Sequence, residues 1–173
     1  MSADDPVFDP QRILETLERH GVEYVIVGGF GSQVQGATRQ TIDLDLVPST
    51  TADNIERLAA ALDHLNARLR VAGMTDDEAR QLPIVIDGAT LRAFGSTTWM
   101  TDAGPLDVLH DLPTAGGGRT YVELVQRSGD YSLSGVVVSV ASLDDIIDSK
   151  THADRPKDRD ALPELLRLRR QRD

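Results

Sequence analysis

The 173-residue sequence contains no cysteine. This absence excludes a disulfide framework and any metal site built from thiolates. The sequence also has no apolar stretch close to the roughly 20 residues that a transmembrane helix needs. Its first ten residues are acidic, unlike the basic start of a secretory signal. Together these absences favour a cytoplasmic protein that does not contact a membrane.

Basic residues are also scarce, and the formal net charge is −10. A charge of this sign argues against a protein that coats nucleic acids in general. The charge is unevenly spread, because residues 1–149 carry 10 basic and 23 acidic residues whereas residues 150–173 carry 8 and 5. A polyanion would therefore bind most readily at the C-terminal segment, although an ordinary solvated helix face gives the same pattern.

Length and composition indicate one folded domain. A hydrophobic content of 40% with 27% charged residues is typical of a globular protein, and this length suits one well-buried core. We expect a single domain over residues 1–173. Its main core should span about residues 8–112, and a C-terminal strand and helices should span about residues 113–173.

Three segments carry helix signals. Asp-Pro opens a helix over residues 9–20, with the aspartate as cap. Apolar spacings of three and four predict an amphipathic helix over residues 51–70. The pattern SLDD at residues 142–145 has the form of a capping box and predicts a further helix. We expect Pro156 and Pro163 to separate the C-terminal helices.

The remaining elements are predicted from apolar runs that glycine and proline bound. Strands are expected at residues 23–29, 41–47, 84–94, 96–101, 105–112 and 136–140. Short helices are expected at residues 31–37, 75–83 and 120–128, and a flexible loop at residues 114–119. Strands that alternate with helices indicate an α/β or α+β fold.

Two carboxylates lie one residue apart in a strand that otherwise reads as buried. Side chains i and i+2 of a strand share a face, so Asp43 and Asp45 should point one way while Ile42, Leu44 and Leu46 point into the core. Neighbouring carboxylates repel and raise each other's pKa unless a cation lies between them. A hard divalent cation with oxygen ligands would provide that charge. The alternative is a solvent-facing edge of an amphipathic strand.

A glycine-rich turn precedes this strand. Gly28, Gly29 and Gly31 allow backbone N–H groups to approach an anion closely, and a helix N-terminus adds a favourable partial charge. Ser32 offers a hydroxyl at the same place. The turn is therefore a candidate phosphate site, although a tight turn alone would also use glycine.

The segment Gly28-Gly29-Phe30-Gly31-Ser32, followed by Asp43-Leu44-Asp45, resembles the G-G-x-G-S…D-x-D signature of the polymerase-β-type nucleotidyltransferase superfamily. The resemblance implies a mixed sheet flanked by helices, with C-terminal helices. It also implies that Gly28, Gly29, Gly31 and Ser32 bind a nucleoside triphosphate. Two Mg²⁺ ions would be bound by Asp43, Asp45 and a third carboxylate from a later strand. Asp107 in GPLDVL matches best, and Asp102 and Asp111 are rivals.

The chain has 16 arginines but only two lysines, Lys150 and Lys157. Lysine binds phosphate as a point charge, whereas arginine presents a planar fork. Two lysines seven residues apart therefore suggest phosphate contacts. The alternative is a salt-bridged helix start with the pairs Lys150–Asp154 and Lys157–Asp160.

The segment VASLDDIIDSKTHADRPKDRDAL resembles a narrower branch of the superfamily, the AbiEii-like and MenT-like nucleotidyltransferases, many of which are toxins of toxin–antitoxin pairs. This resemblance implies that Lys150 contacts the nucleotide phosphates and that Asp160 belongs to the catalytic cluster. Lys157 and Asp158 would support them. The residues THAD depart from the small residues that often follow the lysine in that branch.

These features predict a Mg²⁺-dependent enzyme that transfers nucleotides from a nucleoside triphosphate to the 3′ end of tRNA, with Asp107 taking the acceptor proton. A cognate antitoxin is expected, and phosphorylation at Ser32, Thr38 or Thr41 would inhibit by repulsion from the acids. The alternative acceptors are a protein hydroxyl and a small aminoglycoside-like alcohol. Two further alternatives are a catalytically silent nucleotide-binding module and a protein-interaction domain, although the latter leaves the acidic strand unexplained.

Overall fold

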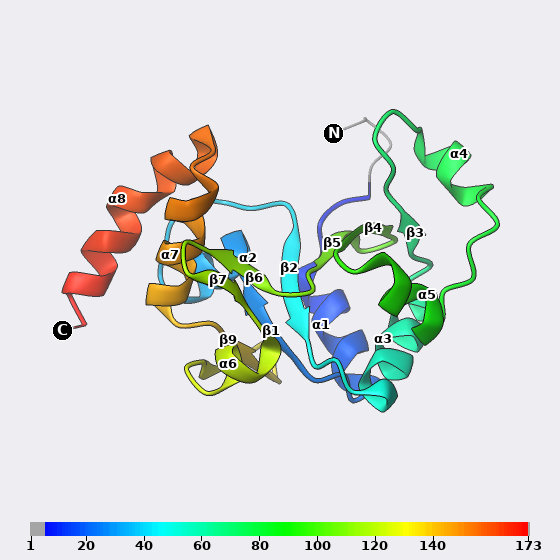
Figure 1. Cartoon of the computed structure of the whole chain (residues 1–173), viewed down its shortest axis with the longest axis horizontal. Helices are drawn as coiled ribbons and strands as arrows, with labels where there is room; N and C mark the ends of the chain where they lie inside the picture. The colour runs from blue at the N-terminus through cyan, green and yellow to red at the C-terminus, as the bar shows by residue number, and fades with distance from the viewer. Residues whose placement is uncertain (1–5, 173) are drawn as a thin grey trace.

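The computed structural model describes residues 6–172, and its centre is a seven-stranded mixed sheet (Figure 1). In order across the sheet, the strands are β3 (Arg68–Leu69), β4 (Thr97–Thr101), β5 (Gly104–Val108), β2 (Leu44–Pro48), β1 (Tyr24–Val27), β9 (Val136–Val140) and β8 (Gly129–Leu133). The strands β6 (Leu112–Thr114) and β7 (Gly117–Arg119) form a separate hairpin. The sheet is mixed because β2 pairs antiparallel with β1 and parallel with β5. The expected α/β class with a mixed sheet is confirmed.

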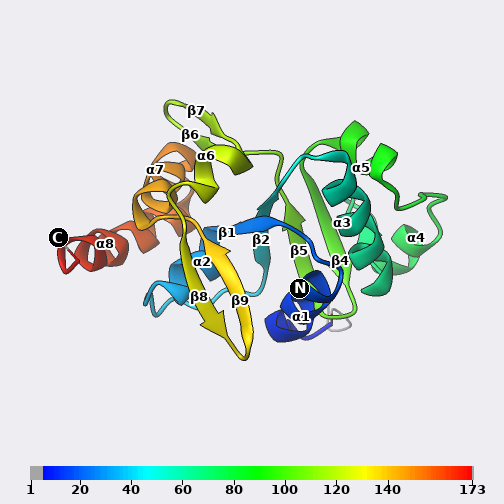
Figure 2. The ribbon, with the colours of Figure 1, turned by 90° about the horizontal axis from the view of Figure 1, so that it is seen from below.

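Helices cover both faces of this sheet. They are α1 (Pro10–Arg19), α2 (Gly28–Val34), α3 (Ala52–His64), α4 (Asp76–Arg80), α5 (Gly88–Phe94), α6 (Tyr121–Val125), α7 (Leu143–Ala153) and α8 (Pro156–Arg170). The apolar residues of α1 and α3 share one core cluster with the sheet, and those of α6, α7 and α8 share a second. Figure 2 shows α7 and α8 at the end of the molecule away from α3, α4 and α5. None of the helices in residues 6–172 combines the length and the apolar character that crossing a bilayer requires.

Helix α1 follows its sequence signal, and α3 follows the first part of its own. Asp9 caps α1 by accepting a hydrogen bond of 3.1 Å from the Arg12 N–H, and burial of the apolar stripe fixes the helix on the sheet. The helix α3 ends at His64 instead of continuing to residue 70. Asn66 takes a φ of +50°, so the chain turns and Leu69 lies in β3.

Three other expectations are wrong, and one strand was missed. Residues 88–94 form α5 rather than a strand, because the Asp87 side chain accepts from the Thr90 N–H and caps a helix. The expected loop at residues 114–119 is the β6–β7 hairpin, and Gly117, where β7 begins, has a φ of +108°. The edge strand β8 was not expected. Pro163 lies inside α8, which continues because its buried side chains pack against α7.

The register of the sheet places one acid beside another. Asp45 of β2 pairs with Asp107 of β5, and Asp107 pairs with Thr98 of β4. Directly paired residues share a face, so these three side chains lie on the face that α2 and α7 cover. Leu44 lies on the opposite face in the core with α1 and α3. Ile42, which we expected in the core, lies before β2 and is 51% exposed.

Candidate active site

The glycines form an elbow at which β1 continues directly into α2. Gly28 has a φ of +63°, and a Cβ at this position would collide with the Asp45 carboxylate. A Cβ on Gly29 would lie 2.8 Å from the Thr41 hydroxyl oxygen. The helix therefore begins at Gly28, three residues earlier than expected, and glycine is needed for the acid to lie against it. Ser32 is buried and locks the elbow, since its hydroxyl donates to the Gly28 carbonyl at 2.8 Å.

The three candidate acids line one cavity of about 500 Å³. Asp45 and Asp107 reach it from adjacent strands, and Asp43 reaches it from the residue before β2, where it accepts a hydrogen bond from the Thr41 hydroxyl. Of the other predicted site residues, the same cavity contains Gly28, Gly29, Ser32, Lys150 and Lys157. Segments more than 100 residues apart in the sequence thus meet at one place.

Burial and mutual repulsion dominate the electrostatics of these acids. Burial, and after it the charges of Asp43 and Asp107, raise the pKa of Asp45 to about 7, against the opposing effects of the Gly29 N–H and Lys157. Burial also raises the pKa of Asp107, against the opposing effect of the Thr98 side chain; Asp43 adds to the rise, and Lys157 and Arg70 oppose it. The three acids are therefore held close together, and Lys157 offsets their repulsion only in part.

The donor set fits a hard divalent cation by charge and by atom type. Carboxylate oxygens are the ligands that Mg²⁺ prefers, and the buried Oδ1 of Asp107 has no hydrogen-bond partner within residues 6–172. No three acid or histidine side chains in this part of the chain are already arranged closely enough to hold a metal ion. Binding of Mg²⁺ by Asp43, Asp45 and Asp107 therefore stays a prediction.

The two lysines differ in their surroundings. The Lys150 ammonium lies 3.3 Å from the carboxylate of Asp158, which is fully buried and also accepts from Arg155 Nε at 2.6 Å. Although burial raises the pKa of Asp158, the Arg155 hydrogen bond and the Lys150 charge hold it below its usual value. Lys157 is exposed, and among residues 6–172 no carboxylate lies within 4.0 Å of its ammonium group. Lys157 is thus a solvent-accessible cation that faces the acids.

The structure does not bring Asp160 into the cavity. Its side chain is 68% exposed and lies 3.9 Å from Arg39. Residues two apart on a helix point to nearly opposite sides, and the buried acid of this helix start is Asp158. The structure thus places Asp158 rather than Asp160 against Lys150, and a catalytic role for Asp160 stays a prediction. Gly31 also lies outside the cavity and packs against Ile146, where a Cβ would come within 3.2 Å.

The lysine pairs of the alternative interpretation do not form within residues 6–172. Asp154 pairs with Arg159 instead of Lys150. Sequence reasoning also missed Arg39 and Arg155, which line the cavity. Among so many arginines, only the position of Arg155 directly before the Pro156 helix start could have singled it out.

The rivals of Asp107 are engaged elsewhere. Asp102 accepts from Asn66 at 2.7 Å and from Arg68 at 3.2 Å. Asp111 lies beside Gly118 in the β6–β7 hairpin, where a Cβ on that glycine would collide with its carboxylate. Neither lines the cavity of the three acids. This geometry favours Asp107 as the third acid.

The three candidate phosphorylation residues also differ in accessibility. Ser32 is 5% exposed, and the Thr41 hydroxyl is bound to Asp43. Thr38 is exposed, and its hydroxyl donates to Glu164 at 2.9 Å. Of the three, Thr38 is the residue that a modifying enzyme would reach, and the phosphorylation hypothesis stays untested.

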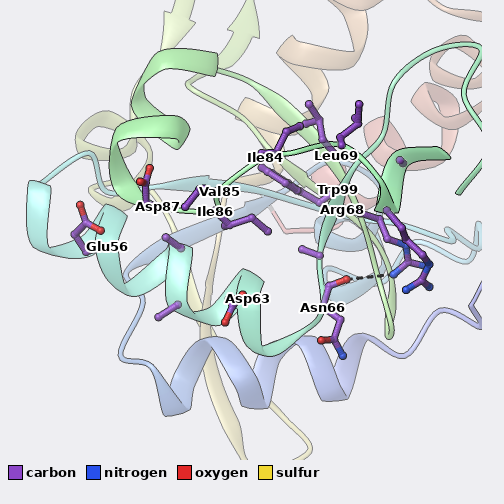
Figure 3. Close-up of a pocket in the computed structure, with 16 residues that line it drawn as sticks. Glu56, Asp63, Asn66, Arg68, Leu69, Ile84, Val85, Ile86, Asp87 and Trp99 are labelled. Carbon is purple, nitrogen blue, oxygen red and sulfur yellow. Dashed lines mark hydrogen bonds between the residues drawn. The ribbon is translucent and has the colours of Figure 1, made fainter. Parts of the chain in front are cut away.

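A larger cavity, of about 750 Å³, lies between α3, β3 and the segment before α5 (Figure 3). Figure 3 shows Arg68 at one end, where it donates to the Asn66 carbonyl at 3.2 Å. Trp99 lines this cavity and lies on the sheet face opposite to Thr98. The cavity therefore opens away from the three acids and does not belong to their site.

Replacing Asp45 with asparagine is expected to stabilise the metal-free protein at pH 8, by on the order of 2 kcal/mol, because it removes a repelled buried charge. The pKa of Asp45 is about 7 in the folded protein against 3.8 ordinarily. Between these values the folded state binds the extra proton, so this group makes the wild type more stable as the pH falls. The advantage of the variant should shrink between pH 8 and pH 5. Thermal unfolding in EDTA at both pH values measures it, and a variant less stable than wild type at pH 8 contradicts it.

No protein-family model and no curated protein sequence matches the chain, but several solved structures resemble it. The lincomycin-bound lincosamide antibiotic adenylyltransferase LnuA superposes with a TM-score of 0.61 at 16% identity, covering 94% of this chain and 99% of its own. The antibiotic-resistance factor ANT(2″)-Ia gives 0.54 at 18% identity, covering 92% and 79%. TM1012 of Thermotoga maritima gives 0.54 at 13% identity, covering 94% and 96%. The chain has the nucleotidyltransferase fold that these structures share.

Proposed function

We propose that the protein transfers a nucleotidyl group from a nucleoside triphosphate to an acceptor hydroxyl. One observation carries this proposal: three repelling acids, a glycine elbow and two lysines line the same cavity. A protein that only bound partners would have no use for such an arrangement, since each buried like charge destabilises the fold. A triphosphate would supply negative charge for the lysines, and a divalent cation would supply positive charge for the acids.

The residues of the chain take separate parts in the reaction. Lys157, Lys150 and the Gly28–Gly29 elbow bind the phosphates and hold the α-phosphorus in front of the acids. Asp107 accepts the proton of the acceptor hydroxyl as a new oxygen–phosphorus bond forms, while the bond to pyrophosphate breaks. The raised pKa of Asp107 suits a group that must take up a proton. Mg²⁺, held by Asp43, Asp45 and Asp107, would supply charge neutralisation and a more acidic acceptor hydroxyl.

The leading acceptor is the 3′ end of tRNA, which the resemblance of the C-terminal motif to the toxin branch supports. The same resemblance supports a cognate antitoxin and action in the cytoplasm. The basic C-terminal segment supports it less than we expected, because its arginines are largely paired with acids. Lys157 remains as an accessible cation beside the acids.

A small alcohol is the second candidate acceptor, and the structural neighbours favour it. LnuA is a lincosamide antibiotic adenylyltransferase, and ANT(2″)-Ia is an antibiotic-resistance factor that has been seen with adenylyl-2″-tobramycin. Both share the fold of this chain at low identity. A hydroxyl of an antibiotic or of a similar compound therefore has to be tested beside RNA.

Incubation with each of the four α-labelled nucleotides, Mg²⁺ and one acceptor class at a time tests the proposal. The acceptors are bulk tRNA, an aminoglycoside and lincosamide panel, and a protein extract. We expect label in tRNA with at least one nucleotide, and release of one pyrophosphate for each nucleotide added. Label in the antibiotics alone would replace tRNA by the second candidate. No transfer to any acceptor would contradict the proposed function and leave a silent nucleotide-binding module.

A further inference from the structure

One row of paired residues crosses the sheet and continues beyond the acids. Asp45 pairs with Asp107, and Asp107 pairs with Thr98. The N–H of Arg70, just after β3, donates to the Thr98 carbonyl at 2.8 Å. Neighbouring strands are about 4.8 Å apart, so the backbones of Arg70 and Asp107 lie roughly 10 Å from each other. The extended side chain of Arg70 and a bound anion would together span the distance to Asp107.

The phosphate-binding groups lie at the other side of the acids. The glycine elbow begins α2, and Lys150 and Lys157 lie on α7 and α8. Figures 1 and 2 both show α7 and α8 on one side of β2, and β4 and α4 on the other. In phosphoryl and nucleotidyl transfer the attacking and leaving oxygens are roughly in line. If pyrophosphate leaves toward α2, α7 and α8, the acceptor must arrive over β4 and β3.

A cavity of about 700 Å³ lies on that approach. Arg70 lines it together with Met74, which is 38% exposed. The two other arginines of the cavity are paired with acids, because Arg68 contacts Asp76 and Asp102, and Arg80 contacts Asp76. Arg70 is exposed, and no carboxylate of residues 6–172 lies within 4.0 Å of it. The cavity thus offers one available cation beside an adaptable apolar surface.

We propose that Arg70 binds a phosphodiester next to the attacking hydroxyl, so that the acceptor is the 3′ end of a polynucleotide. The inference rests on the proposed nucleotidyl transfer and selects its acceptor class. An ammonium-bearing alcohol would be repelled by Arg70, whereas a phosphate gains a charge-assisted contact. Besides Asp76, this cavity contains one other acid, Asp77. Asp77 lies in the first turn of α4, where the helix dipole favours a negative charge.

In the reaction, the 3′ oxygen of the polynucleotide forms the bond to the α-phosphorus. The bond from the α-phosphorus to the bridging oxygen breaks, pyrophosphate leaves toward Lys157, and the hydroxyl proton passes to Asp107. The product is the same strand, longer by one nucleotide, with a new 3′ hydroxyl. Arg70 takes no part in proton transfer and acts on acceptor binding.

The first experiment measures binding of a fluorescent RNA that copies the 3′ end of tRNA, without nucleotide, at several salt concentrations. Arg70→Ala should weaken binding by about tenfold and reduce the slope of affinity against salt by about one. Arg80→Ala is the matched control from the same cavity, and it should stay within twofold of wild type. Affinity for a fluorescent nucleoside triphosphate should stay within twofold in both variants.

A second measurement isolates the phosphate itself. Replacing the terminal phosphodiester of the RNA by an uncharged methylphosphonate should weaken binding to the wild type but not to Arg70→Ala. Equal loss in both proteins, or an Arg70→Ala affinity within twofold of wild type, overturns the inference. An active wild type that labels small alcohols but no polynucleotide overturns it too and leaves nucleotidyl transfer intact. A wild type that transfers nothing contradicts the proposed function, and the binding data alone then decide the role of Arg70.

Discussion

Nucleotidyl transfer is expected to slow by about 10³-fold in kcat when Asp107 is replaced by asparagine, because the variant loses the group that we propose as acceptor of the hydroxyl proton. The amide keeps the shape of the side chain, and it relieves repulsion with Asp43 and Asp45. The variant should therefore remain folded. Single-turnover rates with saturating nucleotide and acceptor measure the effect, and circular dichroism measures the fold.

Asp111→Asn is the matched control, since Asp111 is the nearest rival in sequence and lies outside the cavity. Its kcat should stay within twofold of wild type. A kcat for Asp107→Asn within tenfold of wild type would show that another group takes the proton. An inactive Asp111→Asn beside an active Asp107→Asn would identify Asp111 as the third acid instead.

Asp145→Ala is expected to lower the free energy of unfolding by about 2 to 4 kcal/mol. Asp145 is fully buried, and its Oδ1 lies 3.1 Å from Arg119 Nε and 3.2 Å from Arg127 Nη2. Neither nitrogen is aligned as a hydrogen bond to this oxygen, so the attraction is mainly coulombic. Ser142 adds a hydrogen bond of 2.7 Å to the other oxygen. The carboxylate thus ties the β6–β7 hairpin and the end of α6 to α7, which carries Lys150.

Urea unfolding at pH 7 measures this loss, and Asp144→Ala is the control one residue away. Asp144 is 58% exposed and pairs with Arg169 at 3.3 Å on the surface, so its removal should change stability by less than about 1 kcal/mol. The two arginines that pair with Asp145 are partly exposed, so water can hydrate them once the carboxylate is removed. The expected loss of unfolding free energy is therefore smaller than for a wholly buried pair. Equal effects of the two substitutions would contradict the structural role of Asp145.

The acids of the site could be read from local pattern, because a lone carboxylate in an apolar strand stands out. Asp43, Asp45 and Asp107 were recognised in this way, and all three line the cavity. Their convergence could not be derived locally, since it depends on β2 and β5 pairing in parallel across 60 residues of sequence. The family resemblance, rather than the pattern, predicted that they meet.

Helix orientation was the main source of error at the site. The sequence offered Asp158 and Asp160 at the start of one helix, and only the packing of α8 on α7 decides which of them faces inward. Arg70 was also missed, because its use depends on β3, a strand of two residues that the periodicity of the preceding helix obscured. Edge strands such as β8 bury little on either face, so their signal is weak as well.

Helix α8 forms one side of the cavity that the three acids line, and this has a consequence for mutations in the gene. Lys157, Ala161 and Leu165 line the space in front of Asp43 and Asp45, although they follow them by more than 100 residues. A stop codon between Ala153 and Pro156 would spare the three acids and the glycine elbow, yet remove this side of their cavity. Loss-of-function alleles are accordingly expected at the codons of α8 as well as at the codons of the acids.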